Sequence, residues 1–498
     1  MTRTETHWND LNQHVREIEH LISVQALLGW DQQVNLPPKA HAARGEQSAL
    51  MSSLVHNRMS SARIGSLLSE LEGADDVNAQ QRAGLRVLRR QHDRAVKVPA
   101  DLASAMARAS ALGFQTWHEA RTQKDFSRFA PSLVELVDLS RQTAAAINPD
   151  VHPYDALLND YDPGCTSVQL DDIFGRLHEG LRELLGAIQG VELTGAVDLE
   201  MEEGLQRAMY QEVTRAIGYD LDAGRIDDAA HPFTINLGEG DVRITTTVDT
   251  QNMMSGLGAT LHEAGHGMYE QGIPGEFRGT GLRAAASLGV HESQSRFWEN
   301  AIGRSKAFLN WYASRLAEQP GSPGYSAEQL YRAANRVEPG LIRIFADEVT
   351  YNLHIIIRYR IERALMGGDM EVADIPAEWN RAYREALGVN PPDDGVGCLQ
   401  DVHWSSGSFG YFPSYTLGNL YAAALGSRME RELPDLWEHV GQGSFGPVLA
   451  WLRTHVHERG AELDGADLIQ DIVGEVDLVD NMLGYLWDRH GALYGVSR

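Results

Sequence analysis

Helical periodicity governs most of this 498-residue chain. Apolar side chains recur at steps of three and four residues, which gives one face of an α-helix an apolar stripe. The clearest examples are Leu21, Val24 and Leu28, the run from Ile173 to Ile188, and Val448, Leu452 and Val456. Glycine and proline stand mostly between such stretches, where they favour turns. The pattern predicts a mainly α-helical protein.

One segment departs from this period. Residues 233–237 and 242–248 alternate between apolar and polar side chains and are rich in β-branched residues, and Gly-Glu-Gly-Asp joins them. Alternation with period two on both sides of a glycine-containing turn is typical of a β-hairpin. We therefore expect one small sheet within a large helical protein.

The charge and the cysteine content exclude some classes of binding partner and indicate a cellular compartment. The formal net charge is −26, and duplex binding needs Lys and Arg to neutralise phosphates, so we expect no nucleic-acid partner. A basic amphipathic face and an apolar run of ~20 residues are both missing from the sequence, so we expect no membrane contact. Cys165 and Cys398 cannot form a disulfide framework, and the first residues carry no signal-peptide pattern. The expectation is a soluble, cytoplasmic protein.

The strongest chemical signal is His262-Glu263-Ala264-Gly265-His266. Positions i and i+4 of a helix share a face, so both imidazoles can reach one Zn²⁺. Glu263 lies between them and can take a proton from water at the metal. Two surface histidines beside a solvated Glu are the alternative that chance spacing allows.

The position of the third ligand separates the types of zinc peptidase. One type would need Gly and His where Tyr269 and Gly272 stand, and the thermolysin-like spacing would need an acid at Ala286. Glu270 lies one turn further along the same helix, but ligands at i, i+4 and i+8 spread over ~12 Å and cannot converge on a tetrahedral ion.

Glu292 is the best remaining candidate for the third ligand. It lies in a helix-like segment that follows a glycine-containing stretch, residues 272–281, where the chain can reverse. Glu276 is the competitor. His291, the neighbour of Glu292, is then expected beside the ligands rather than among them, and Arg296 stands where a thermolysin-like pattern would place Asp.

Taken in order, the motifs resemble those of the carboxypeptidase Taq family of zinc metallocarboxypeptidases, over most of the chain. The motifs are Trp30-Asp31-Gln32, His231-Pro232-Phe233, Asp241-x-Arg243-x-Thr245, His262-Glu263-x-x-His266, His291-Glu292-Ser293-Gln294, Ile342-Arg343-x-x-Ala346-Asp347, Gly397-x-x-Gln400-Asp401-x-His403-Trp404 and Tyr411-Phe412-Pro413-Ser414-Tyr415.

The resemblance implies a mainly α-helical fold, saddle-like or clam-like, with a deep groove, one small β-sheet and a neurolysin-like gluzincin architecture. It implies a single peptidase domain over residues 1–498, in which two helical lobes flank the groove. The metal core is expected at about residues 231–300 and the substrate-side motifs at about 340–420. It also implies a homodimer.

The implied activity is a metallocarboxypeptidase that releases C-terminal amino acids from peptides with broad specificity and disfavours proline. The family assigns one Zn²⁺ per chain to His262, His266 and Glu292, and the role of general base to Glu263. Co²⁺ would fit the same ligand set, so the sequence leaves the native metal open. Two other functions stay open: an oligopeptidase that cleaves internal bonds of short peptides, and a catalytically inactive, zinc-stabilised peptide-binding protein.

His403, Tyr411 and Tyr415 are the candidates for stabilising the transition state, by likeness to the neurolysin-type oligopeptidases. The tyrosines follow Ser405 to Gly410, a glycine-containing segment that we expect to be flexible enough to close over substrate. Ordinary buried tyrosines with bonded hydroxyls are the alternative interpretation.

Arg343 is the candidate for binding the substrate's terminal carboxylate. Spacing places Arg343 and Asp347 at i and i+4 of a predicted helix, so an intrahelical ion pair is an equal alternative, and the resemblance favours substrate binding. Asp347 could also hold the guanidinium in place. Arg243 and His231 are further substrate-binding candidates, for which a purely structural role fits the sequence as well.

Overall fold

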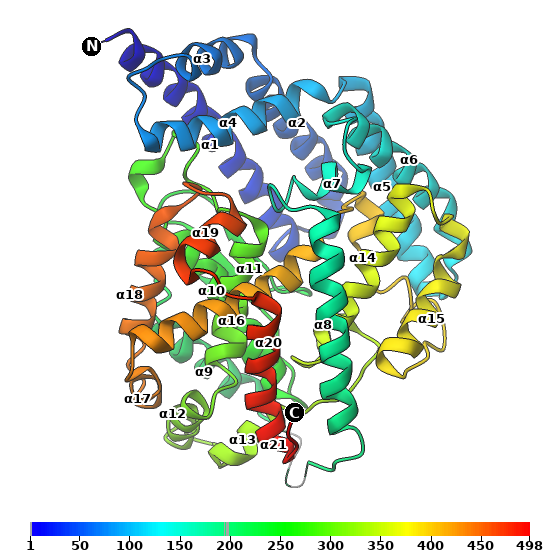
Figure 1. Ribbon diagram of the computed structural model, residues 1–498, viewed down its shortest axis with the longest axis vertical. Helices are drawn as coiled ribbons and strands as arrows, with labels where there is room; N and C mark the ends of the chain where they lie inside the picture. Colours follow the sequence, from blue (N-terminus) through cyan, green and yellow to red (C-terminus); the bar gives the residue numbers. More distant parts are fainter. Residues whose placement is uncertain (1, 194, 196–198) are drawn as a thin grey trace. The chain divides into compact units, whose positions relative to one another are not determined.

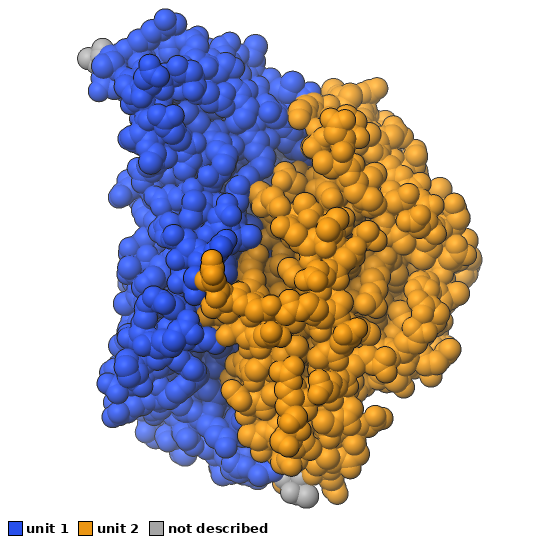
Figure 2. Space-filling view, viewed as in Figure 1, with its two compact units in different colours: residues 1–96, 196–334, 425–474 blue, residues 97–195, 335–424, 475–498 orange. Residues whose placement is uncertain are grey.

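The computed structural model describes residues 2–193, 195 and 199–498. These residues are mainly helical and contain one three-stranded sheet, so the prediction of a mainly α-helical protein with one small sheet is confirmed (Figure 1). They divide into two compact units (Figure 2). Unit 1 comprises residues 1–96, 196–334 and 425–474, and unit 2 comprises residues 97–195, 335–424 and 475–498. Among the described helices, none is both long enough and apolar enough for a bilayer crossing.

Unit 1 holds the sheet and most of the α-helices. Its helices are α1 (Arg3–Val34), α2 (His41–Met59), α3 (Ala62–Glu72), α4 (Ala79–Lys97), α9 (Glu203–Ile217), α10 (Met253–Gly272), α11 (Leu288–Arg296), α12 (Lys306–Ala317), α13 (Ala327–Ala334), α17 (Leu436–Gly441), α18 (Gly446–His455) and α19 (Gly465–Val473). Short 3₁₀ or π turns are η1 (Pro38–Ala40), η3 (Gly275–Phe277), η4 (Phe297–Ile302) and η8 (His457–Arg459).

The regular structure of unit 2 is helical, and its described residues include no β-strand. Its helices are α5 (Ala100–Gln123), α6 (Ala130–Ile147), α7 (Pro153–Leu158), α8 (Ser167–Ile188), α14 (Tyr351–Gly367), α15 (Ile375–Leu387), α20 (Leu478–Leu486) and α21 (Ala492–Tyr494). Its short turns are η2 (Phe126–Arg128), η5 (Arg343–Phe345), η6 (Val372–Asp374), η7 (His403–Ser406) and η9 (Trp487–Gly491). Helix α16 (Pro413–Glu432) begins in unit 2 and ends in unit 1.

The periodic stretches form helices as predicted, because their apolar stripes find a core. In α8, Leu177, Leu181 and Leu184 are completely buried, and α8 packs against α14 within unit 2 (Figure 1). In α1, Leu11 lies in the apolar cluster shared with α3 and α4. Val24 of the same helix is 47% exposed, so periodicity identified the helix but not every buried position.

The predicted hairpin is also confirmed. Strands β2 (Thr234–Asn236) and β3 (Val242–Thr246) pair antiparallel, with Ile235 opposite Arg243. The sequence reasoning missed β1 (Ile226–Asp228), which pairs parallel to β3 and places β3 in the centre of the sheet. Helix α10 packs against β3, and this contact fixes the helix that carries the metal motif.

A glycine allows the next helix to approach α10 closely. The chain reverses between Gly272 and Ser287, whose side chain caps α11 by accepting a hydrogen bond from the Val290 amide. A Cβ at Gly265 would lie 2.5 Å from the Gln294 carbonyl oxygen, too close for any real side chain. Glycine inside the motif therefore lets the backbones of α10 and α11 touch.

Candidate metal and peptide site

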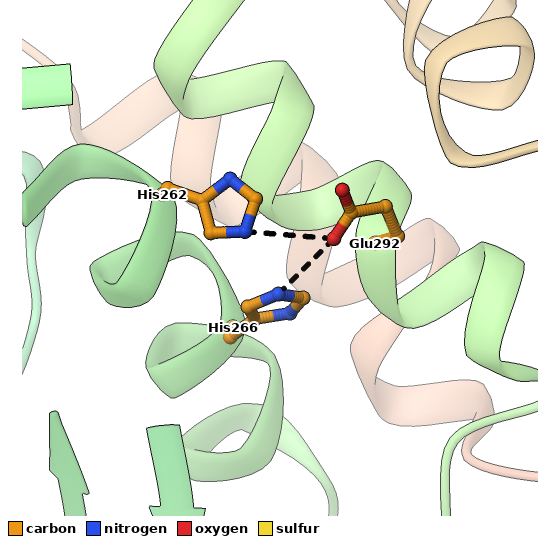
Figure 3. A group of neighbouring side chains, drawn as sticks. All are labelled: His262, His266 and Glu292. Atoms are coloured by element: carbon orange, nitrogen blue, oxygen red, sulfur yellow. Dashed lines mark ion pairs between the residues drawn. The ribbon is translucent and has the colours of Figure 1, made fainter. Parts of the chain in front are cut away.

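Three side chains of unit 1 converge on one point (Figure 3). His262 and His266 project from α10 and Glu292 from α11. Their nearest donor atoms all lie within 4.8 Å of one another. The Glu292 carboxylate oxygen Oε2 is 3.5 Å from His262 Nε2 and 3.3 Å from His266 Nε2. Two imidazole nitrogens and one carboxylate oxygen form a donor set that suits Zn²⁺ and leaves a coordination position open.

The outer nitrogen of each imidazole is held by a further side chain. His262 Nδ1 lies 2.9 Å from Glu299 Oε2, and His266 Nδ1 lies 2.5 Å from His291 Nδ1. A carboxylate can only accept, so Nδ1 of His262 carries the proton and Nε2 keeps its lone pair toward Glu292. Such an arrangement fixes the tautomer in which the inner nitrogen is free to bind a metal.

His291 begins a chain of hydrogen bonds that fixes the tautomer of His266. His291 Nε2 lies 3.0 Å from Glu270 Oε1, and the Asn236 amide donates to Glu270 Oε2 at 2.7 Å. Glu270 forces His291 to donate through Nε2, so His291 Nδ1 accepts from His266 Nδ1. His291 therefore lies beside the cluster, and Glu270, rejected as a ligand from its spacing, supports it indirectly.

Glu292 is kept ionised by cations. Burial alone would raise the pKa of Glu292, but the Arg296 guanidinium and the two imidazoles hold that pKa below its usual range. Arg296 Nε donates to Glu292 Oε1 at 2.6 Å, which leaves Oε2 directed at the histidines. Arg296 also reaches Glu299 Oε2 at 3.1 Å. The arginine that replaces the thermolysin-like Asp thus links both carboxylates of the site.

Glu263 lies in the same buried region with one oxygen held. Thr234 of β2 donates to Glu263 Oε2 at 2.7 Å. Burial raises the pKa of Glu263, while the neighbouring His262 and the Thr234 hydroxyl oppose the rise. A carboxyl with a raised pKa is suited to accept a proton and release it again. Glu276, the competing ligand candidate, is exposed in η3 and lies outside the cluster.

Arg243 and His231 lie near the sheet of unit 1. Both Nε and Nη2 of Arg243 donate to the Asp241 carboxylate at 2.8 Å, and the guanidinium stacks 4.4 Å from the centre of the Trp30 ring. His231 is exposed, and its Nδ1 is 2.9 Å from the carbonyl oxygen of Pro232. The Arg243 fork is therefore occupied by a structural ion pair.

In unit 2, Arg343 lies in a buried ion cluster. Its Nε and Nη2 donate to Asp401 Oδ1 at 3.0 and 2.8 Å, and Nη1 donates to the Tyr351 hydroxyl at 3.0 Å. Arg358 binds the other oxygen of Asp401, with Nε at 2.7 Å. The two guanidinium groups hold the pKa of Asp401 far below its usual range against the effect of burial. One carboxylate thus fixes two arginines.

The predicted pairing of Arg343 with Asp347 is wrong. Arg343 lies in the short turn η5, and Ala346 after it is extended, with φ −67° and ψ 142°. Asp347 instead accepts from the amides of Val349 and Thr350 at 2.9 and 3.0 Å, just before α14 begins. Asp347 therefore lies outside α14 and accepts from the free amides at its start. Arg343 and Asp347 are not on one helix, so their side chains do not share a helix face.

His403, Tyr411 and Tyr415 lie together in unit 2. His403 Nε2 is 3.3 Å from the Tyr415 hydroxyl, and the ring centres of His403 and Tyr411 are 5.1 Å apart. The Arg343 guanidinium lies 4.9 Å from the centre of the Tyr415 ring. The structure therefore brings the three candidates into one group and links them to the Arg343 cluster.

The segment between His403 and Tyr411 does not match the expected flexibility. Trp404 Nε1 donates to Glu362 Oε1 at 2.8 Å, and the Gly410 amide donates to Glu362 Oε2 at 3.1 Å. Ser405 and Phe409 are buried. The glycines that suggested a mobile loop instead allow it to pack tightly.

Several residues of these clusters escaped the sequence reasoning. Glu299, which holds His262, lies two helical turns after Glu292, and this same-face spacing was the signal that could have found it. Thr234 and Arg358 gave no signal, because their partners Glu263 and Asp401 lie far away in the sequence.

Comparisons with known proteins agree with one another. Residues 10–490 match the model of the carboxypeptidase Taq (M32) metallopeptidase family. The chain is 41% identical to thermostable carboxypeptidase 1 of Thermus thermophilus over 99% of each chain. It is 36% identical to carboxypeptidase 1 of Bacillus subtilis, over 96% of this chain and 97% of that one. The solved M32 carboxypeptidase from Deinococcus radiodurans is similar with a TM-score of 0.94 and 37% identity, covering 99% of this chain and 100% of that one.

Proposed function

The chain belongs to the carboxypeptidase Taq (M32) metallopeptidase family and is a metallocarboxypeptidase, and from this premise we propose how its own residues carry out the reaction. His262, His266 and Glu292 hold one Zn²⁺, and Glu263 is the general base. The observation that carries the proposal is the convergence of three donor atoms within 4.8 Å beside the buried Glu263.

Two functions are proposed for the metal. A divalent ion in such a site acts as a Lewis acid on the scissile carbonyl and lowers the pKa of water. Co²⁺ would suit the same donors as Zn²⁺, so the native metal depends on availability.

Glu263 moves the proton. Thr234 occupies Glu263 Oε2, so we assign Oε1 to the proton transfer. This oxygen takes a proton from the attacking water and passes it to the leaving amine. Burial of the carboxylate raises its pKa, which favours the uptake of the proton from water. The Thr234 bond keeps the carboxylate in one orientation during the two transfers.

Arg343 is proposed to bind the substrate's terminal carboxylate. A guanidinium has five N–H donors, and the bonds to Asp401 and Tyr351 use three of them. One N–H then stays on each Nη nitrogen, which is the arrangement a carboxylate binds with both oxygens. His403, Tyr411 and Tyr415 are proposed to donate to the oxyanion of the transition state. Arg243 and His231 are weaker candidates for substrate contacts.

Further properties expected from the family stay proposals. These are the homodimer, the deep groove of a saddle-like, neurolysin-like architecture, and a single peptidase domain over residues 1–498. The cytoplasmic location, expected from the low cysteine content, is proposed as well. We also propose broad tolerance for the released side chain. An oligopeptidase activity on internal bonds and a catalytically inactive, zinc-stabilised binding protein are the less favoured alternatives.

The test compares Glu263→Gln with the wild type. Both proteins, loaded with Zn²⁺, are incubated with a defined peptide and the products are followed by mass spectrometry. We expect the wild type to give a ladder that shortens one residue at a time from the C-terminus. Glu263→Gln should keep its metal and lose about 10²–10⁴-fold in kcat, while Glu276→Gln, the same change at an exposed position, should keep its activity.

Each alternative gives a different result. Internal fragments would identify an oligopeptidase, and bound metal without turnover in the wild type would identify an inactive binding protein. Near-normal turnover in metal-loaded Glu263→Gln would refute the assignment of the general base.

A further inference from the structure

Glu362 is a buried acid in unit 2 that lies in none of the sequence motifs and in neither of the clusters described above. It lies on α14 and its side chain is completely buried. Three donors surround its carboxylate: Trp404 Nε1 at 2.8 Å on Oε1, and the Tyr154 hydroxyl at 2.9 Å and the Gly410 amide at 3.1 Å on Oε2. A buried charge that costs desolvation needs a reason to be there.

Two of the three donors belong to one segment, residues 404–410. Trp404 directly follows His403, and Gly410 directly precedes Tyr411. Glu362 therefore binds this segment at both ends, one residue away from two of the proposed catalytic side chains. The two bonds use different carboxylate oxygens, so the carboxylate sets the distance between the two ends.

Neighbouring helices hold the same segment from outside. A Cβ at Gly410 would lie 2.9 Å from the Leu158 amide nitrogen at the end of α7, and the φ of Gly410 is +89°. A Cβ at Gly113 of α5 would lie 2.5 Å from the Ser405 carbonyl oxygen. The backbone of the segment thus touches two helices directly. No empty space separates the segment from α5 and α7 at these contacts, so a small change in the geometry of the segment must displace its neighbours.

We propose that Glu362 is a positioning residue for peptide hydrolysis: by binding Trp404 and Gly410 together, it fixes the places of His403 and Tyr411. The inference rests on the proposed function of these two residues in the transition state. Glu362 itself does not touch substrate in this proposal. Its effect reaches the reaction only through the side chains at the two ends of the segment.

The chemistry requires a carboxylate at this position. All three groups around it can donate, and a carboxylate accepts on both oxygens, whereas an amide presents one donor group to donors. Burial raises the pKa of Glu362 to about 7, while the bonds from Trp404, Gly410 and Tyr154 and the charge of Arg358 oppose the rise. Glutamine has nearly the same size as glutamate, but its NH₂ group cannot accept a hydrogen bond from the donors that surround the carboxylate. Glu362→Gln is therefore the informative substitution.

The experiment measures kcat and KM of zinc-loaded Glu362→Gln on a free-acid peptide, above neutral pH. Misplacing catalytic groups by about 1 Å costs on the order of 10²-fold. We expect kcat to fall about ten- to a hundredfold, with KM within about twofold and an unchanged metal content, because the transition state alone is affected. Tyr154→Phe is the matched control. It removes one donor, leaves both bonds to the segment, and should keep kcat within about twofold.

Repeating the substitution in a protein that already lacks the proposed catalytic side chains separates a positioning role from a general loss of structure. In a His403→Ala, Tyr411→Phe protein, Glu362→Gln should lower kcat by about twofold or less, because the residues through which it acts are gone. An equal loss in both backgrounds, or full kcat in the Glu362→Gln single variant, would overturn the inference. Where Glu362→Gln fails to fold, Trp404→Phe, which removes one of the two bonds, should show the same dependence on the background.

The outcome also distinguishes this inference from the proposed function. If His403→Ala and Tyr411→Phe each keep full kcat, the proposed roles of these residues fail and the inference fails with them. If they lose activity and Glu362→Gln does not, only the inference is overturned.

Discussion

The replacement of Arg343 by alanine tests what makes this enzyme an exopeptidase. A substrate's C-terminus differs from the rest of the peptide by one negative charge, and the guanidinium has one N–H left on each Nη nitrogen after its bonds to Asp401 and Tyr351. A hydrogen bond to a charged group contributes roughly 1.5–3 kcal/mol. At about 1.4 kcal/mol per tenfold, this predicts a preference of about ten- to a hundredfold for a free C-terminus over an amidated one.

The assay measures kcat/KM on a matched pair of peptides, one with a free acid and one amidated. Arg343→Ala should lose the preference mainly by becoming slower on the free acid, with the amide little changed. Asp401 keeps Arg358 as a partner, 2.6 Å away, so the substitution does not leave an unpaired buried carboxylate. Arg343→Lys keeps the charge without the planar fork, and should restore only part of the preference.

The reasoning is refuted if Arg343→Ala still distinguishes fully between acid and amide. The binding group would then lie elsewhere, and Arg243→Ala is the next variant to test. After its two bonds to Asp241, Arg243 still has three N–H donors with which it could bind a carboxylate.

Three further predictions concern the metal site and stability. Glu292→Ala should leave substoichiometric, easily chelated zinc while Glu276→Ala keeps one equivalent, and metal analysis with the reverse outcome would move the ligand to Glu276. Gly265→Ala should lower the unfolding free energy by about 1–3 kcal/mol in urea denaturation, because the new Cβ meets the Gln294 carbonyl oxygen at 2.5 Å; unchanged stability would show that the helices separate freely. The pKa of Glu362 is raised to about 7 in the folded protein, so the folded state holds its proton more tightly than the unfolded chain, and stability from this group should fall by roughly 3–4 kcal/mol between about pH 4 and 7. Glu362→Gln should flatten that part of the pH–stability profile, and an unchanged slope would contradict the raised pKa.

Local pattern was enough for much of the fold and for the centre of the metal site. The stripe in α8 and the alternation in β2 and β3 repeat within a few residues, and both formed as predicted. The spacing of His262 and His266 places them on one helix face, and Glu292 was the better of the two acids left as candidates, the other being Glu276. All of this information lies within short stretches of chain.

Predictions from local spacing were wrong where a polar side chain could bond either a near neighbour in the sequence or a distant residue. Helical spacing paired Arg343 with Asp347, but Asp347 bonds the amides that begin α14, and Arg343 turns to Asp401. Glycines suggested a flexible segment before Tyr411, but Glu362 binds both of its ends.

What the sequence alone determined is therefore most of the secondary structure, the placement of His262 and His266 on one helix face and, through the order of its motifs, the family. The tertiary structure alone decided which distant groups meet. Thr234 on Glu263, Glu299 on His262 and Asp401 on Arg343 are contacts of this kind. The physical reason is range: backbone preferences and apolar periodicity act over a few residues, whereas a buried polar group takes whichever partner the packing of remote segments brings within hydrogen-bonding distance.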